Sequence, residues 1–285
     1  MIPVNIGPYT LRLDSNIHSV RTEISKIYGA IRPETTAQSV QQYTVSLKPT
    51  TLLRKWFRPQ INFFFDGESP FHPLPKSQAY PLLEWGMNWC IAGNDFSRLI
   101  IHSAVAVKNG KAIIFPADPG SGKSTLSALL ALSGWHIYSD ELAIIEFESG
   151  RVNPIFRPIC LKNASIDIIK HKMTSGYMTS PVHDTSKGTV AHAMLLKRET
   201  FDQWQPAPIA AVVFPKYNAE TYLDIEPFDQ LTGISKLIAN AFNFNVVGER
   251  GFNCIANIVA RAQLFAIEYG DFEEADAFLT ELVSE

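Results

Sequence analysis

The sequence has few cysteines, and their spacing marks neither a disulfide framework nor a metal cluster. Cys90, Cys160 and Cys254 are its only three cysteines, they lie far apart, and no CxxC pair occurs. Disulfide-rich domains and cysteine zinc sites both need several cysteines at short, paired spacings. We therefore expect neither of these classes.

An excess of basic residues is also missing. The chain has 25 Lys and Arg against 28 Asp and Glu, which gives a formal net charge of −3 at pH 7, and no basic block occurs. A protein that binds nucleic acid through its phosphates usually carries a basic excess. We therefore expect no nucleic-acid partner.

Long apolar runs are absent as well. The longest of them, such as residues 209–214, fall far short of the roughly 20 residues that a membrane-spanning helix needs. The first residues lack a basic n-region and include Pro3 and Pro8, so they do not read as a secretory signal. We expect a soluble, cytoplasmic globular protein without a membrane partner, and its 285 residues allow one large domain or two smaller ones.

The N-terminal part of the sequence mixes strand and helix patterns. We expect strands within 2–13, 44–47 and 61–65, and helices within 15–29 and 79–92. The first helix would have Ser15 as its N-cap and Gly29 as its stop signal. These elements predict an N-terminal α+β region over residues 1–97, followed by a second domain over residues 98–285.

The pattern sharpens from residue 99 onward. Two apolar runs, 99–108 and 111–116, flank Asn109-Gly110, and this dipeptide is a strong hairpin signal because a type I′ turn needs a positive φ at both positions. A helix over 123–133 follows. Further strands are expected at 135–138, 142–147 and 209–214, and helices at 229–242, 251–264 and 272–282, so that the C-terminal third is predicted to be helical.

A phosphate-binding motif stands between the second of these strands and the helix that follows it. The nine residues are Ala117, Asp118, Pro119, Gly120, Ser121, Gly122, Lys123, Ser124 and Thr125. They match G-x-x-x-x-G-K-[ST], except that Ala117 replaces the first glycine. In such a loop the backbone N–H groups hold phosphate oxygens, the lysine reaches the β- and γ-phosphates, and the hydroxyl of Ser124 faces Mg²⁺. The motif predicts binding of a phosphate donor such as ATP with Mg²⁺, and it leaves GTP and pyrophosphate open.

The region around the motif resembles a known family. Residues 101–145 resemble the core of bacterial HPr kinase/phosphorylase over the run IHSAVAVKNGKAIIFPADPGSGKSTLSALLALSGWHIYSDELAII. The HPr-related kinase branch is resembled further in the segments EWGMNWC, FRPICLKNASI, TSKGTVAH and AFNFNVVGERGF. The resemblance implies an α/β fold: a P-loop kinase core with a mixed sheet, similar to HPr kinase and phosphoenolpyruvate carboxykinase, in addition to the N-terminal α+β region.

Three acidic or basic positions follow from this resemblance. His102 lies 21 residues before Lys123, and Asp140 lies 17 residues after it, as do the active-site histidine and first catalytic aspartate of the family. The resemblance implies that Asp140 accepts the proton of a serine hydroxyl and that Glu141, in place of a second aspartate, holds Mg²⁺. Phosphoryl transfer needs mainly positioning and charge stabilisation, which a lysine, a metal and one carboxylate provide.

Other polar residues are weaker candidates. Arg157 and Lys162 would bring cations to the transferring phosphoryl group, although Phe156 stands where the family has an acidic residue. Residues 185–189, with Lys187, predict a loop that either closes over substrate or is a plain surface loop. Three residues between the C-terminal helices resemble the position of the family's substrate-capture region: Asn243, Asn245 and Arg250.

The sequence therefore predicts an ATP- and Mg²⁺-dependent phosphotransferase that phosphorylates a serine-type hydroxyl. Its acceptor would be a protein such as HPr, a peptide or a small metabolite, and a homo-oligomeric state is left open. The alternative is a regulatory or assembly ATPase that binds a nucleotide and has no dedicated phosphoacceptor. The carboxylate of Asp140 separates the two, because a kinase needs it and a binder needs only the loop.

Overall fold

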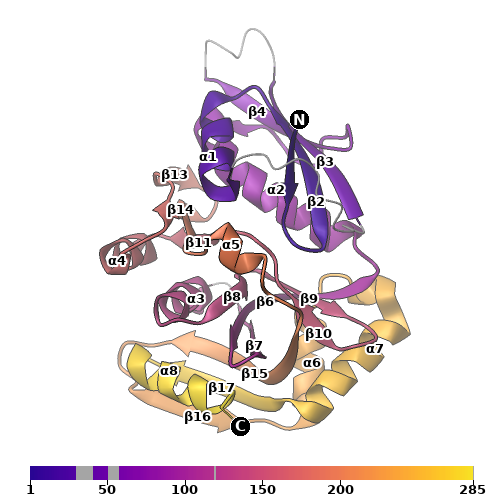
Figure 1. Cartoon of the computed structure of the whole chain (residues 1–285), viewed down its shortest axis with the longest axis vertical. Coiled ribbons are helices and arrows are strands. Elements are labelled where there is room, and N and C mark those ends of the chain that lie inside the picture. Colours follow the sequence, from indigo (N-terminus) through magenta and orange to yellow (C-terminus); the bar gives the residue numbers. More distant parts are fainter. Residues whose placement is uncertain (30–40, 51–57, 119, 285) are drawn as a thin grey trace. The chain divides into compact units, whose positions relative to one another are not determined.

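The chain forms a mixed α/β structure of two compact units. The structure is a computed structural model that describes residues 1–29, 41–50, 58–118 and 120–284, and these ranges contain eight α-helices and several sheets (Figure 1). One unit consists of Met1–Ile91 and Ile155–Asp202, and the other of Ala92–Pro154 and Gln203–Glu285.

This division differs from the boundary that the sequence suggested between residues 97 and 98. The first crossing falls nearby, after Ile91, but Ile155–Asp202 returns to the first unit. The contacts that tie the returning segment to the first unit include a buried ion pair between Arg157 and Glu84, with 2.7 Å between Nη2 and Oε2. No pattern of local hydrophobicity reports a pairing over that sequence separation.

The first unit contains a five-stranded sheet in the order β1-β2-β3-β4-β5. Its elements are β1 (Ile2–Asn5), β2 (Tyr9–Ser15), α1 (His18–Tyr28), β3 (Gln41–Pro49), β4 (Gln60–Phe65), β5 (Leu74–Pro75) and α2 (Ala79–Asn94). Only β2 and β3 pair in parallel; the other neighbours are antiparallel. The predicted strands and helices are confirmed, but Ile17 is the N-cap of α1, and Ser15 Oγ instead accepts from the Ile17 N–H at 3.2 Å.

Close packing in this unit depends on a glycine in α2. A Cβ at Gly86 would lie 2.1 Å from the ring of Phe63 in β4, so the ring rests directly against the helix backbone. Both the ring of Phe63 and the neighbouring Met87 are fully buried. The missing side chain at position 86 thus permits the helix to approach the sheet.

A second sheet of the first unit is antiparallel. It contains β11 (Ile159–Lys162), β12 (Tyr177–Met178), β13 (Val182–Thr185) and β14 (Gly188–Met194), with α4 (Ala164–Lys172) and α5 (Arg198–Phe201) beside them in sequence. Residues 185–189, predicted as a loop, are a tight hairpin turn between β13 and β14. The Thr185 hydroxyl donates to the carbonyl of Gly188 at 2.6 Å and accepts from the Lys187 N–H at 3.1 Å.

The second unit is a larger mixed sheet. Its strands are β6 (Arg98–Lys108), β7 (Lys111–Pro116), β8 (His136–Ser139), β9 (Leu142–Glu146), β10 (Arg151–Asn153), β15 (Ala207–Tyr217), β16 (Leu223–Pro227) and β17 (Gln263–Tyr269). The strand order is β10-β9-β6-β7-β15-β17-β16, and β8 also pairs with β6. β7 and β17 run parallel to β15, and the other pairs are antiparallel.

The predicted Asn-Gly hairpin is confirmed. β6 and β7 pair antiparallel from Ser103↔Pro116 to Lys108↔Lys111, and the turn residues Asn109 and Gly110 have φ values of 54° and 74°. The strand that precedes the phosphate motif therefore has an antiparallel partner on one side and a parallel partner, β15, on the other. The hairpin signal predicted the antiparallel partner of this strand.

The prediction of a wholly helical C-terminal third is wrong. The expected helices are present as α6 (Gln230–Asn240), α7 (Phe244–Arg261) and α8 (Phe272–Glu281), but β16 and β17 lie among them. The helix expected to reach residue 264 ends at Arg261, and Leu264 belongs to β17. A short apolar run fits either structure, and here its parallel pairing with β15, a contact distant in sequence, selects the strand.

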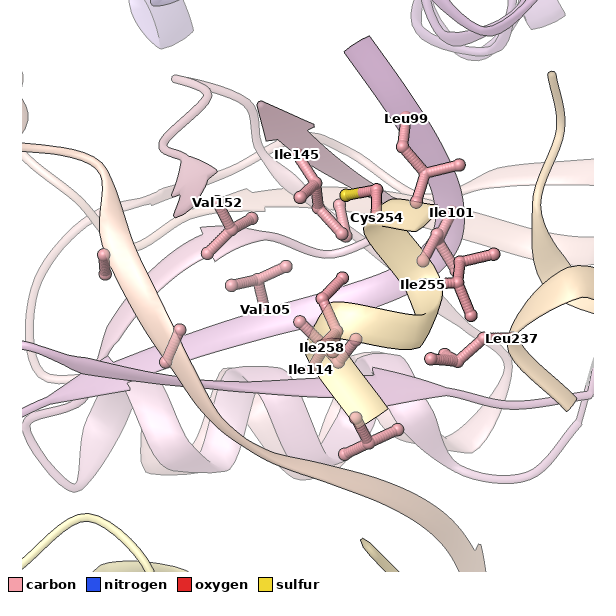
Figure 2. Packing of buried hydrophobic residues seen from close by; sticks show 14 of the residues in the cluster. Leu99, Ile101, Val105, Ile114, Ile145, Val152, Leu237, Cys254, Ile255 and Ile258 are labelled. Atoms are coloured by element: carbon pink, nitrogen blue, oxygen red, sulfur yellow. The ribbon is translucent and has the colours of Figure 1, made fainter. Parts of the chain in front are cut away.

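Helices cover both faces of this sheet. On one face, residues of α6 and α7 pack against strand side chains; Figure 2 shows Cys254, Ile255 and Ile258 of α7 among Leu99, Ile101, Val105 and Ile145. On the other face, α3 (Lys123–Leu132) and α8 pack with residues such as Phe115, Val213 and Tyr269. Within the described ranges, no helix has the length and apolar character needed to cross a bilayer.

Candidate phosphate-binding and phosphotransfer site

The phosphate motif folds as a turn between β7 and α3. Gly120 and Gly122 have φ values of 93° and 91°, in the left-handed region that favours glycine. The Ser121 N–H donates to the carbonyl of Asp118 at 3.2 Å, and Gly122 is the N-cap of α3. Pro119 lies outside the described residues. The rest of the turn has the strand, loop and helix order that the motif predicted, and the positive end of a helix dipole favours an anion there.

Lys123, the first residue of α3, is held against a histidine of β6. Its Nζ lies 3.2 Å from Nε2 of His102, and only 9% of the lysine is exposed. An ammonium group can only donate a hydrogen bond, so a charged Lys123 requires Nε2 of His102 as an unprotonated acceptor in this contact. The pair that the sequence separated by 21 residues is therefore in direct contact.

The Asp140–Glu141 turn connects to the same part of β6. It joins β8 to β9, and Ser139 Oγ accepts from the N–H groups of Glu141 and Leu142 at 3.3 and 2.9 Å. The N–H of Ser103 donates to the carbonyl of Glu141 at 3.1 Å, and His102 pairs with Leu142. The backbone thus places Asp140, which is 6% exposed, in a turn that lies beside the segment of β6 that carries His102.

Strand β6 is the element that gathers the site. Ser103 pairs with Pro116 on β7, directly before the predicted phosphate motif, and its own N–H donates to the turn after β8. Lys123, His102 and the backbone of the Asp140–Glu141 turn consequently lie at one edge of this sheet. Such an edge, beyond the end of the strand that leads into a phosphate loop, is where α/β sheets bind ligands.

The donor set suits a magnesium ion that is held largely by phosphate and water. Among the residues that the structure describes, no group of three or more His, Cys, Asp or Glu side chains forms a metal site of its own. Mg²⁺ commonly takes one or two carboxylates plus substrate phosphates and keeps several waters. Ser124, in the first turn of α3, and Glu141 supply oxygen atoms of that kind.

Two sequence candidates have structural contacts in the first unit. Arg157 donates through Nε and Nη2 to the carboxylate of Glu84, which also accepts from the hydroxyls of Tyr28 and Tyr80. Burial and the charge of Glu84 raise the pKa of both tyrosines well above the usual value. The backbone N–H of Lys162 donates to Ser165 Oγ at 2.9 Å.

Lys187 also lies in the first unit, where its Nζ is 5.0 Å from the ring centroid of Trp85. Neither this contact nor those of Arg157 and Lys162 involve the residues gathered along β6. These three cations belong to the first unit, whereas the residues gathered along β6 belong to the second unit.

The proposed substrate-capture residues have different places in the second unit. Asn243 is a structural residue: its side chain accepts from the Ile100 N–H and donates to the carbonyls of Asp95 and Arg98. Arg250 is exposed, pairs with Glu148 at 3.2 Å and stacks over Phe147. Asn245 is exposed on α7.

Sequence reasoning missed two aromatic residues beside the site. The ring of Phe242, 53% exposed, lies 5.4 Å from the ring of His102. Tyr217, 54% exposed, packs against Gly122. Tyr217 belongs to none of the segments that carry the resemblance, and Phe242 lies within AFNFNVVGERGF, where nothing singles it out. Only the tertiary structure brings Tyr217 to Gly122 and Phe242 to His102.

Comparison with known proteins adds no assignment, because no family model matches the chain and no curated protein matches it.

Proposed function

We propose that this protein is an ATP- and Mg²⁺-dependent phosphotransferase with a P-loop kinase core, and that it phosphorylates a serine-type hydroxyl on a protein, peptide or small molecule. The observation that carries the proposal is the contact between Lys123 and His102 at the head of α3. A lysine of a phosphate loop held in this way is positioned before any ligand arrives. The hydrogen bonds between β6 and the Asp140–Glu141 turn add a carboxylate to the same edge.

Each residue has a role that follows from its chemistry. Lys123 and the N–H groups at the start of α3 hold the β- and γ-phosphates, and His102 keeps the ammonium group in place. Bound Mg²⁺ would neutralise charge on the phosphates, with Ser124 and Glu141 as its protein oxygens. Asp140 orients the acceptor hydroxyl and takes its proton.

Every bond, proton and electron pair of the transfer step is accounted for. The acceptor oxygen forms a bond to the γ-phosphorus as the bond from that phosphorus to the β–γ bridging oxygen breaks. The hydroxyl proton passes to the Asp140 carboxylate, and ADP leaves with the electron pair of the broken bond. No other reactant is required.

The test follows the label from γ-labelled ATP in desalted lysate, separated into protein and small-molecule fractions, with Mg²⁺ and purified protein. Lys123→Ala should abolish labelling because it removes the phosphate contact. Asp140→Asn should lower transfer by about 10²- to 10⁴-fold, the range for a general base, and leave MgATP affinity within a few-fold. Asp224→Asn, at an exposed position on β16, is the matched control and should transfer normally.

The outcomes separate the acceptor classes. Wild-type-dependent label on a polypeptide identifies a protein or peptide kinase, and mass spectrometry then names the modified residue. Label on a metabolite identifies a small-molecule kinase. Label that appears only as inorganic phosphate, at equal rates in wild type and Asp140→Asn, would refute the kinase proposal in favour of a nucleotide-binding ATPase.

A further inference from the structure

Tyr217 stands at the carboxyl end of β15, on the sheet face that α3 covers. Ala211 and Val213 of this strand are buried on that face with residues of α3 and α8. Side chains alternate along a strand, so Tyr217 continues the same row. Its register partner on β17, Tyr269, is in the same cluster. β15 pairs in parallel with β7, so its carboxyl end lies at the edge where the phosphate loop begins.

Tyr217 is joined directly to the phosphate loop. Its N–H donates to the carbonyl of Ser121 at 2.9 Å. A Cβ at Gly122 would lie 2.9 Å from the Cβ of Tyr217, so a side chain larger than hydrogen at position 122 would collide with the tyrosine. The loop and the end of β15 therefore form one continuous surface.

Hydrogen bonds between the end of β15 and strand β17 hold the backbone around Tyr217 in place. The Asn218 N–H donates to the carbonyl of Tyr269 at 2.9 Å. Glu268 accepts from Lys216 at 2.6 Å, and from the side chains of Asn218 and Thr221 at 2.6 and 3.1 Å. These bonds, that from Asn218 foremost, lower the pKa of Glu268 to about 2. The segment after β15 is thus anchored on β17.

The ring of Tyr217 is ordered and still open to a ligand. It packs edge-on against Tyr269, with centroids 5.8 Å apart and an interplanar angle of 74°. Tyr269 is 3% exposed, whereas Tyr217 is 54% exposed. Burial of Tyr217 by a ligand would cost little side-chain entropy because its packing already restrains the ring.

We infer that Tyr217 forms the nucleoside side of the donor site, where its ring stacks on the base of a nucleoside triphosphate. This inference rests on the proposed function, since the phosphate loop must hold the triphosphate. The inference restricts the phosphate donor to a nucleotide, where the proposed function alone would allow any phosphate anhydride. An aromatic face stacks on every base and reads no hydrogen-bonding edge, so Tyr217 favours ATP and GTP alike over pyrophosphate or tripolyphosphate.

Calorimetric titration with MgATP, MgGTP and magnesium tripolyphosphate tests the inference. Loss of a base stack weakens binding by about 5- to 150-fold. We expect Tyr217→Leu, which keeps an apolar contact with Tyr269 and Gly122 but has no flat face, to lose this factor for both nucleotides and to bind tripolyphosphate like the wild type. Tyr217→Phe should bind all three ligands normally.

The matched control is Tyr222→Leu. Tyr222 is also exposed, at 65%, and its hydroxyl donates to Glu274 of α8. Its loss should leave all three affinities unchanged.

Three results would overturn the inference in different ways. Unchanged MgATP affinity in Tyr217→Leu would show that the ring does not contact the nucleoside. An equal loss for ATP and tripolyphosphate would show that Tyr217 only braces the loop. If wild-type protein binds neither ATP nor tripolyphosphate, the proposed function itself fails, and this inference fails with it.

Discussion

The ion pair between Glu84 and Arg157 supports a quantitative prediction about the first unit. The two side chains are 3% and 7% exposed, and Arg157 donates twice to the Glu84 carboxylate, at 3.1 and 2.7 Å. Arg157 Nη2 also donates to the carbonyl of Glu84 at 2.8 Å. Two tyrosine hydroxyls complete the shell of the carboxylate. Arg157→Met would leave the buried negative charge with the tyrosines alone.

Removal of one partner from a buried pair costs about 3–5 kcal/mol, because the remaining charge stays out of water. The whole free energy of unfolding of a domain is about 5–15 kcal/mol. At about 2–4 °C per kcal/mol, Tm should fall by about 6–20 °C. Urea unfolding followed by tryptophan fluorescence measures the change, with Trp85 beside Glu84 on α2 as a reporter.

The double variant Glu84→Gln/Arg157→Met is the control. It removes both charges and keeps an amide oxygen that accepts from the tyrosine hydroxyls, so it should recover more than half of the stability that Arg157→Met loses. A loss of less than about 1 kcal/mol in Arg157→Met, or additive losses in the double variant, would refute the reasoning. MgATP affinity of the folded single variant should match the wild type.

Two further predictions concern packing and burial. Gly86→Ala should destabilise the first unit by about 1–3 kcal/mol, since the added Cβ would overlap the Phe63 ring. Gly93→Ala is the control, because a Cβ at this position of the same helix would meet open space. Thermal melts compare the two variants, and equal melting temperatures would refute the packing argument. Burial raises the pKa of Cys90 to about 12 and of Cys254 to about 11. At pH 8 both therefore remain protonated, and a thiol reagent such as DTNB should label them only in denaturant.

Much of the fold near the phosphate loop could be predicted because its signals are local. The Asn-Gly turn requires positive φ at two successive positions, and this requirement alone predicted the antiparallel hairpin of β6 and β7. Gly120 and Gly122 likewise have positive φ values, 93° and 91°, which glycine adopts without strain. The family resemblance implied that His102 and Lys123 lie in one site, and the distance between them is a property of the folded chain.

Elements whose conformation depends on distant partners were not predictable. β17 is a strand because it pairs in parallel with β15, about fifty residues earlier in the sequence, and its apolar residues would equally suit a helix. The hairpin of β13 and β14 was read as a loop because its polar residues resemble one. Arg157 resembled a phosphate ligand in sequence, and only the structure shows its guanidinium on Glu84.

The sequence by itself therefore determined the glycine-containing turn between β7 and α3 and the hairpin that leads into it, since turn geometry depends on neighbouring residues. The tertiary structure alone decided which segments form each unit, which cation is buried in an ion pair, and which tyrosine lies against the loop. These features arise from burial and from strand pairing between residues far apart in the chain, where a free energy of contact, rather than a local propensity, selects the outcome.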